Sequence, residues 1–130
     1  MNDAVFHMIS GGPAPVAPYS HVVETGGWLF VTGQVATDSE PDDRPPPDGV
    51  EAQTRKVMDN LQRVLAGVNA TLADVVCVRA FLTNCERDYA AFNRVYAEYF
   101  PADRRPARTT VGVTGLARGT IVEIDMIARR

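Results

Sequence analysis

Apolar and polar residues alternate along several short stretches of this chain with the period of two that is typical of β-strands. The alternation predicts strands over residues 5–9, 20–25, 28–35, 75–83, 106–111 and 121–128. Gly26 and Gly27 separate the second strand from the third, so we expect these two strands to form a hairpin.

Apolar residues recur at helical spacing in two other stretches. The first stretch follows an acidic, proline-rich segment over residues 40–47, which we interpret as an exposed loop. Asp48 and Glu51 form a D-x-x-E pattern that predicts an N-terminal cap, and Gly67 and Asn69 predict the end of this helix. Its apolar positions are Val57, Leu61, Val64, Leu65 and Val68.

The second helix is expected to begin after Asn84 and to stop at Pro101. One stripe of this helix is aromatic and consists of Tyr89, Phe92, Tyr96 and Phe100. The predicted order is β-β-β-α-β-α-β-β. This order indicates an α+β fold in which one mixed sheet of about six strands carries two helices on one face.

Large apolar side chains occupy both faces of the predicted sheet. The residues expected to face the helices are Leu29, Val31, Val78 and Leu82. Trp28, Phe30 and Phe81 then point to the opposite face, which no predicted helix covers. A large apolar sheet face is unfavourable in contact with water, so we expect a second copy of the chain to cover this face in a homo-oligomer.

The composition favours an ordinary globular protein. The chain has 130 residues, which suits one domain over residues 1–130, and 45% of them are hydrophobic. Its net charge of −3 disfavours nucleic acid and anionic membranes as partners. It shows neither a membrane span nor a signal-peptide pattern, so we expect a cytoplasmic protein. Cys77 and Cys85 lack a CxxC spacing, and Cys77 is interpreted as a small core residue.

The last two predicted strands carry the candidate chemistry. Arg108, Thr110 and Gly112 share one face of the first, and Glu123 and Asp125 share one face of the second. A guanidinium holds a carboxylate through two hydrogen bonds, and a carboxylate side chain can take a proton from water. The pattern therefore suggests a site for a small carboxylate substrate.

Six short motifs in one order resemble the reactive-intermediate deaminase (RidA/YjgF) family over nearly the whole chain. The motifs are Gly12-Pro13-x-x-x-Ala17-Pro18-Tyr19-Ser20, Phe30-Val31-Thr32-Gly33-Gln34, Asn60-Leu61, Phe92-Asn93-x-x-Tyr96, Pro106-Ala107-Arg108-Thr109 and Val122-Glu123-Ile124-Asp125. The chain departs from the family pattern at Ala17, where glycine is usual, at Thr32, where serine is usual, and at Thr110, where many members carry cysteine.

The resemblance implies a chorismate-mutase-like fold and a homotrimer whose sheets form a central barrel, with three sites in the clefts between chains. It implies hydrolysis of reactive enamines and imines, such as 2-aminoacrylate, to 2-keto acids and ammonia, with no metal and no cofactor. It assigns catalysis to Arg108, Glu123 and Tyr19, and it assigns substrate binding to Arg108, Gly33, Thr32, Asn93 and Thr110.

Each of these residues also has a structural interpretation. Arg108 could form a surface ion pair, Tyr19 could pack, Gly33 could allow a tight strand end, and Asn93 could bond across a subunit interface. The family likeness favours the functional role for Arg108. For Thr32 and Thr110 we weight the functional and the structural role equally, because threonine is common in strands.

Other functions stay open at this point. The chain could be a pathway-specific relative that acts on another enamine or unsaturated acid, or a non-enzymatic trimer that binds small ligands or proteins. The net negative charge disfavours ribonuclease or translation-inhibitor activity, and so does the lack of a sequence pattern that combines aromatic and basic residues for RNA binding. His7 and His21 lack metal-ligand spacing, and Ser20 and His21 are adjacent, so they point to opposite faces of a strand.

Overall fold

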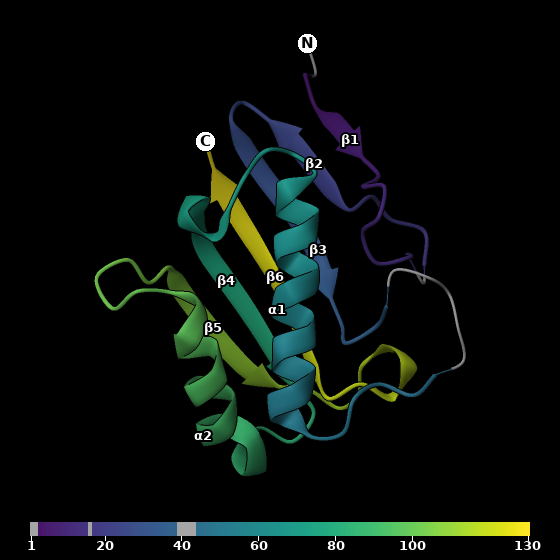
Figure 1. Ribbon diagram of the computed structural model, residues 1–130, viewed down its shortest axis with the longest axis vertical. Helices are drawn as coiled ribbons and strands as arrows, with labels where there is room; N and C mark the ends of the chain where they lie inside the picture. The colour runs from purple at the N-terminus through teal and green to yellow at the C-terminus, as the bar shows by residue number, and fades with distance from the viewer. Residues whose placement is uncertain (1–2, 16, 39–43) are drawn as a thin grey trace.

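A computed structural model describes residues 3–15, 17–38 and 44–130 of the chain. Two helices lie on one face of a single six-stranded sheet (Figure 1). The strands are β1 (Val5–His7), β2 (Val22–Thr25), β3 (Trp28–Gln34), β4 (Val75–Leu82), β5 (Ala107–Gly112) and β6 (Val122–Arg129). The sheet is mixed, as the sequence predicts, and the predicted element order is confirmed. Residues 39–43 of the predicted acidic loop lie outside the described part of the chain.

The sheet has the strand order β1-β2-β3-β6-β4-β5. Neighbouring strands are antiparallel except for β4 and β5, which are parallel. A parallel pair requires a crossover connection, and the helix α2 (Cys85–Tyr96) supplies it. The C-terminal strand β6 therefore lies between β3 and β4, near the centre of the sheet.

The helix α1 (Val50–Ala66) begins differently from the predicted capping pattern. Its N-cap residue is Gly49, with φ 86°, and no side chain caps the helix. The predicted cap was wrong because the chain enters the helix through this positive-φ glycine, which leaves Asp48 one residue too early. Asn84 does cap α2, since its side chain accepts a hydrogen bond from Arg87 N. The helix α2 ends at Tyr96, so Phe100 is buried beyond the helix, after a 3₁₀ turn at Ala97–Tyr99.

The core lies between the sheet and the two helices. Leu29, Val31, Val78 and Leu82 are all buried there, as predicted. On the opposite face, Trp28 and Phe30 are 41% and 45% exposed in the single chain. We call this surface the open face. Cys77 belongs to it, because it pairs with Ile127 across β4 and β6, and the prediction of a core cysteine was wrong.

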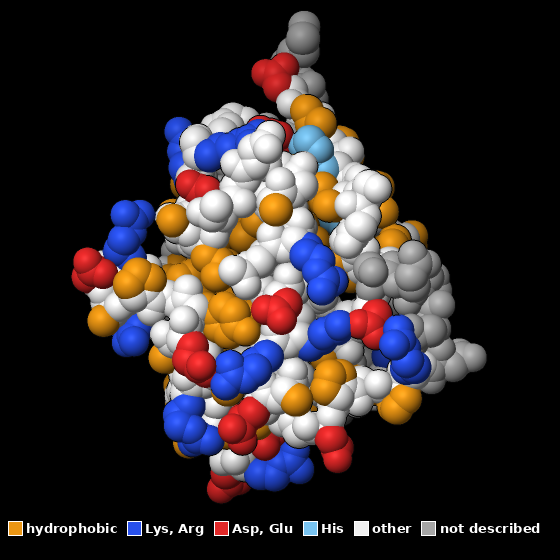
Figure 2. Space-filling model, viewed as in Figure 1, with side chains coloured by type: hydrophobic (Ala, Val, Ile, Leu, Met, Phe, Trp, Pro, Cys, Tyr) orange, Lys and Arg blue, Asp and Glu red, His pale blue; other side chains and the backbone are white. Residues whose placement is uncertain are grey.

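The helix-covered side carries charges of both signs. Figure 2 shows basic and acidic side chains intermixed over this side. Arg55 pairs with Glu98 at 2.9 Å, and Arg94 lies 3.7 Å from Glu51. This side therefore offers no continuous basic surface to nucleic acid. Among the described residues, no helix is long and apolar enough to cross a membrane.

Candidate functional site

Arg108 extends from β5 toward α2 and lies among aromatic rings. Its Nη2 donates a hydrogen bond to Asn93 Oδ1 at 2.8 Å and lies 3.5 Å from the hydroxyl of Tyr89. The guanidinium carbon lies 4.8 Å from the ring centre of Tyr96 and 5.3 Å from that of Phe92. Asn93 and the three rings recur on one side of α2 because residues three and four apart share a helix face. We call this group the Arg108 cluster.

The Arg108 cluster holds a cation without a neutralising anion. No carboxylate in the described part of the chain pairs with Arg108, and its hydrogen bonds there run from Nη2 alone. Aromatic faces attract a guanidinium through the ring quadrupole, so the charge is stabilised while its remaining N–H groups stay available. This is a suitable arrangement for an anionic ligand.

Two hydroxyl groups in this neighbourhood are buried and lack hydrogen-bond partners among the described residues. They are Thr110 Oγ1, on the same face of β5 as Arg108, and the hydroxyl of Tyr96. Burial raises the pKa of Tyr96 to about 12, although the nearby Arg108 acts in the opposite direction. The Tyr96 phenol is therefore neutral at physiological pH.

A pocket of about 220 Å³ lies at the end of β3. We call it the Glu123 pocket. Its lining contains four of the predicted site residues, Tyr19, Thr32, Gly33 and Glu123. The other lining residues are Ala17, Gln34, Val35, Thr37 and Ala117.

A β-bulge shapes this pocket. Val31 pairs with Met126 and Gln34 pairs with Ile124, so Thr32 and Gly33 together oppose a single residue of β6. The bulge brings Gly33 against Glu123, and a Cβ atom at position 33 would lie 2.6 Å from Glu123 Oε2. A side chain at position 33 would displace the Glu123 carboxylate, which occupies the space beside this glycine.

The environment of Glu123 favours its protonated form. Burial raises the pKa of this carboxyl group above its usual value, and the neighbouring Asp125 raises it further. Arg79 acts in the opposite direction with a smaller effect. A carboxylate with a raised pKa is a stronger base once ionised, which suits it to accept a proton from water.

Two buried amides of α1 hold the backbone next to the Glu123 pocket. Asn60 Nδ2 donates to Thr37 O at 2.7 Å and to Val35 O at 3.2 Å. Gln53 accepts from Ile121 N at 2.8 Å and donates to Pro47 O at 3.0 Å. The sequence interpretation missed both roles. The available signal was two amides seven residues apart on the inner face of an amphipathic helix, where polar groups are buried only with partners.

The Arg108 cluster and the Glu123 pocket lie on opposite sides of the sheet. Arg108 pairs with the core residue Val78 and faces α2, whereas Glu123 pairs with Phe81 and alternates with the buried residues Val122 and Ile124. The strand β4 also separates β5 from β6. The structure therefore brings Asn93 and Thr110 to Arg108, and Tyr19, Thr32 and Gly33 to Glu123. It does not bring Arg108 and Glu123 together within one chain.

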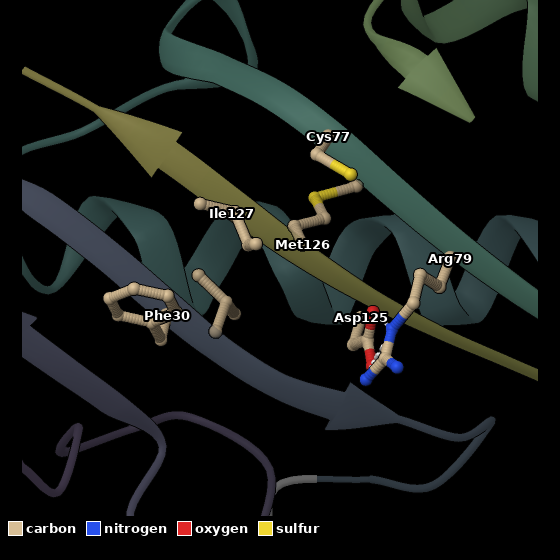
Figure 3. Close-up of a pocket in the computed structure, with 7 residues that line it drawn as sticks. Phe30, Cys77, Arg79, Asp125, Met126 and Ile127 are labelled. Atoms are coloured by element: carbon tan, nitrogen blue, oxygen red, sulfur yellow. Dashed lines mark hydrogen bonds and ion pairs between the residues drawn. The ribbon is translucent and has the colours of Figure 1, made fainter. Parts of the chain in front are cut away.

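The open face also carries a hollow of about 270 Å³ beside an ion pair. Figure 3 shows Arg79 and Asp125 pointing toward each other at one end of it, with Phe30, Cys77 and Ile127 along its wall. Arg79 Nη2 donates to Asp125 Oδ2 at 2.6 Å, and Nε lies 3.0 Å from Oδ1. Because each charge has its counter-ion, this hollow lacks the unpaired cation of the Arg108 cluster. No group of three or more potential ligands that could hold a metal ion occurs in the described part of the chain.

The fold is that of a small α+β protein with an arginine and aromatic cluster on one side of its sheet and a carboxylate pocket on the other. The family model described as "Endoribonuclease L-PSP" matches residues 10–130. A RutC family protein of Pyrococcus horikoshii is 34% identical over 98% of both chains. The chain belongs to this family, also known as the RidA/YjgF family.

Solved structures agree with this assignment. The Rid family protein YyfA of Yersinia pestis superposes with a TM-score of 0.89 and 31% identity, over 98% of this chain and 99% of that one. The E. coli protein TdcF, solved with bound serine, gives a TM-score of 0.83 and 26% identity, over 95% of this chain and 98% of that one. The chorismate-mutase-like fold expected from the motifs is confirmed.

Proposed function

We propose that this protein hydrolyses small enamines and imines that carry a carboxylate, such as 2-aminoacrylate, to 2-keto acids and ammonia. The observation that carries the proposal is the Arg108 guanidinium, which is held by Asn93 and aromatic rings and has no carboxylate partner in the described part of the chain. The serine bound in the related TdcF structure supports a small ligand with a carboxylate and a nitrogen on the adjacent carbon.

We further propose that each site forms between two copies of the chain in a homotrimer. Arg108 and Glu123 lie on opposite sides of the sheet, and a substrate of a few atoms cannot reach both within one chain. The exposed Trp28, Phe30 and Val111 side chains favour packing of the open face against another copy. A head-to-tail arrangement with threefold symmetry would bring the Arg108 cluster of one copy to the Glu123 pocket of the next.

Each predicted site residue has a separate role in the proposed reaction. Arg108 and the backbone N–H of Gly33 bind the substrate carboxylate, with Thr32 and Thr110 nearby as hydroxyl donors, and Asn93 fixes the guanidinium. An enamine substrate first tautomerises to the imine by transfer of a proton from nitrogen to carbon. Glu123 then accepts a proton from water while the water oxygen bonds to the imine carbon. The phenol of Tyr19 orients this water. The proton then passes from Glu123 to the nitrogen, which gives the carbinolamine. The hydroxyl proton of the carbinolamine moves to the amine nitrogen as the carbon–nitrogen bond breaks, so ammonia leaves and the keto acid remains. Positioning and electrostatics supply most of the acceleration.

The test couples a purified dehydratase that releases 2-aminoacrylate to this protein and follows the loss of the imine signal. We expect faster loss with the wild-type protein and a much smaller acceleration with Arg108→Ala. Equal rates with and without wild-type protein would reject the deaminase activity. Light scattering at micromolar concentration tests the assembly, and a monomer there would reject the trimer.

The other interpretations have weaker support. A pathway-specific relative acting on another enamine would use the same residues, so a panel of imines separates it from the activity proposed here. A non-enzymatic trimer would bind carboxylates without turnover. The family description mentions endoribonuclease activity, but the net charge of −3 and the mixed charges of the helix-covered side disfavour RNA as substrate.

A further inference from the structure

The buried residue His21 follows Tyr19 by two residues and bonds to the turn at residues 9–13. His21 is 2% exposed, and its ring is bonded on both sides. Ile9 N donates to Nδ1 at 2.8 Å, and Nε2 lies 2.7 Å from the carbonyl oxygen of Pro13. A backbone N–H can only donate and a carbonyl can only accept. Nδ1 is therefore unprotonated, Nε2 carries the proton, and a single neutral tautomer satisfies both neighbours.

The backbone of His21 connects the same region to the sheet. Its N–H donates to His7 O at 2.9 Å, and its carbonyl accepts from Thr32 N at 3.0 Å, directly before Gly33. The turn at residues 9–12 closes through a bond of 3.1 Å from Gly12 N to Ile9 O. This turn packs on the imidazole, since a Cβ atom at Gly12 would lie 3.5 Å from His21 Cε1. One residue therefore joins β1, the turn and the bulged end of β3.

We propose that His21 is the positioning residue of the Glu123 pocket. Its neutral ring holds residues 9–13 against the sheet and so helps to place Ala17 and Tyr19 along the pocket wall. Protonation puts a hydrogen on Nδ1, where the N–H of Ile9 already points, so the two donors oppose each other and the segment is released. The expected effect on catalysis rests on the proposed function. The expected effect on the position of residues 9–13 does not depend on it.

Other ionisable groups lie on the elements around the His21 ring, and their effects must be distinguished from the effect of His21. His7 on β1 pairs with Glu24 on β2 at 3.0 Å, and Arg130 reaches Glu24 at 2.6 Å. The turn at residues 9–13 has no ionisable side chain. His7 and His21 are the only histidines of the chain, so His7 provides a matched control.

Hydrogen exchange measured by mass spectrometry tests the proposal on the full chain. Exchange of peptides covering residues 9–15 is compared at about pH 5 and about pH 8, on either side of the range where histidine titrates, after correction for intrinsic rates. Wild type and His7→Gln should exchange this segment roughly tenfold faster at the lower pH, as expected for lost hydrogen bonds. His21→Gln should stay protected at both values, because its amide offers an acceptor and a donor like the neutral imidazole.

Two outcomes would overturn the proposal: equal corrected exchange at both values in the wild type, or a pH dependence that persists in His21→Gln and disappears in His7→Gln. The imine assay adds a functional readout, in which His21→Gln should lose less kcat/KM at the lower pH than the wild type does. If exchange behaves as expected but wild type hydrolyses no imine, the proposed function fails while the positioning role stands.

Discussion

The Arg108 cluster and the Glu123 pocket are built in different ways. Regular elements make the cluster: Arg108 follows the alternation of β5, and its neighbours recur on one side of α2. An irregularity makes the pocket, because a bulge in β3 brings Gly33 to Glu123 and distant side chains hold the surrounding backbone. Local periodicity is thus enough to predict the strand face of Arg108 and of Glu123, whereas tertiary contacts are needed to form the pocket around the acid.

The two regions also differ in how their charges depend on the surroundings. A guanidinium remains protonated at all working pH values, so the cluster needs only to position it. The carboxyl group of Glu123 changes protonation with its environment, and burial raises its pKa. Changes to the pocket should therefore alter both the chemistry and the stability of the protein, while changes to the cluster should alter binding.

The largest effect is expected for Glu123→Gln. The amide keeps the size of the side chain but cannot accept the proton of water, so imine hydrolysis should fall by about 100-fold or more. The measurement is kcat in the coupled imine assay, with Asp125→Asn as the neighbouring carboxylate control. A Glu123→Gln variant that retains wild-type kcat would show that this pocket is not the source of the base.

Glu123→Gln also tests the cost of burying the carboxyl group. A raised pKa in the folded state means that this group stabilises the fold fully only at low pH, and that this stability is lost as the pH rises through the folded pKa. The variant should therefore melt at a higher temperature than wild type near neutral pH, and the difference should shrink toward pH values near or below the ordinary glutamate pKa of 4.5. Thermal unfolding at several pH values checks this.

Arg108→Ala should have the next largest effect. A hydrogen bond to a charged group contributes about 1.5–3 kcal/mol, so carboxylate binding and kcat/KM should fall by more than about tenfold. Arg108→Lys should recover only part of the loss, because an ammonium keeps the charge without the planar fork. The matched control is Arg104→Ala, an exposed arginine whose guanidinium bonds only to Ala73 O at 3.4 Å in the described structure. Equal turnover in both variants would show that Arg108 does not hold the substrate carboxylate.

The difference between the two regions explains what the sequence could predict. Strand alternation placed Arg108, Thr110 and Gly112 on one face, and helical spacing placed the aromatic residues in one stripe of the second helix, although the sequence did not show that this stripe contacts Arg108. The same reasoning suggested Arg108 and Glu123 as a pair but could not show that their side chains point to opposite sides. The bulge at Thr32 and Gly33 and the amides of Gln53 and Asn60 were not predicted, because they depend on pairing between distant segments.

Mixing two inactive variants tests whether the halves of a site come from different copies. Arg108→Ala supplies an intact Glu123 pocket, and Glu123→Gln supplies an intact Arg108 cluster. After unfolding and refolding an equal mixture, chance pairing in a head-to-tail ring should make roughly one quarter of the sites complete. We expect roughly that fraction of wild-type activity, compared with almost none for either variant refolded alone. No recovery in trimers shown to contain both chains would contradict a site shared between copies.

Thr110→Ala should have the smallest effect, although Thr110 follows Arg108 by only two residues on the same face. Its Oγ1 is buried and has no hydrogen-bond partner among the described residues, so its loss leaves no other group of the chain unpaired. Activity should stay within about twofold of wild type, since the proposed mechanism relies on proximity, the guanidinium and Glu123. The measurement is kcat/KM in the imine assay, with mass spectrometry of the protein during turnover. A covalent adduct on Thr110, or a loss as large as that of Arg108→Ala, would mean that the cluster supplies a nucleophile as well as a cation.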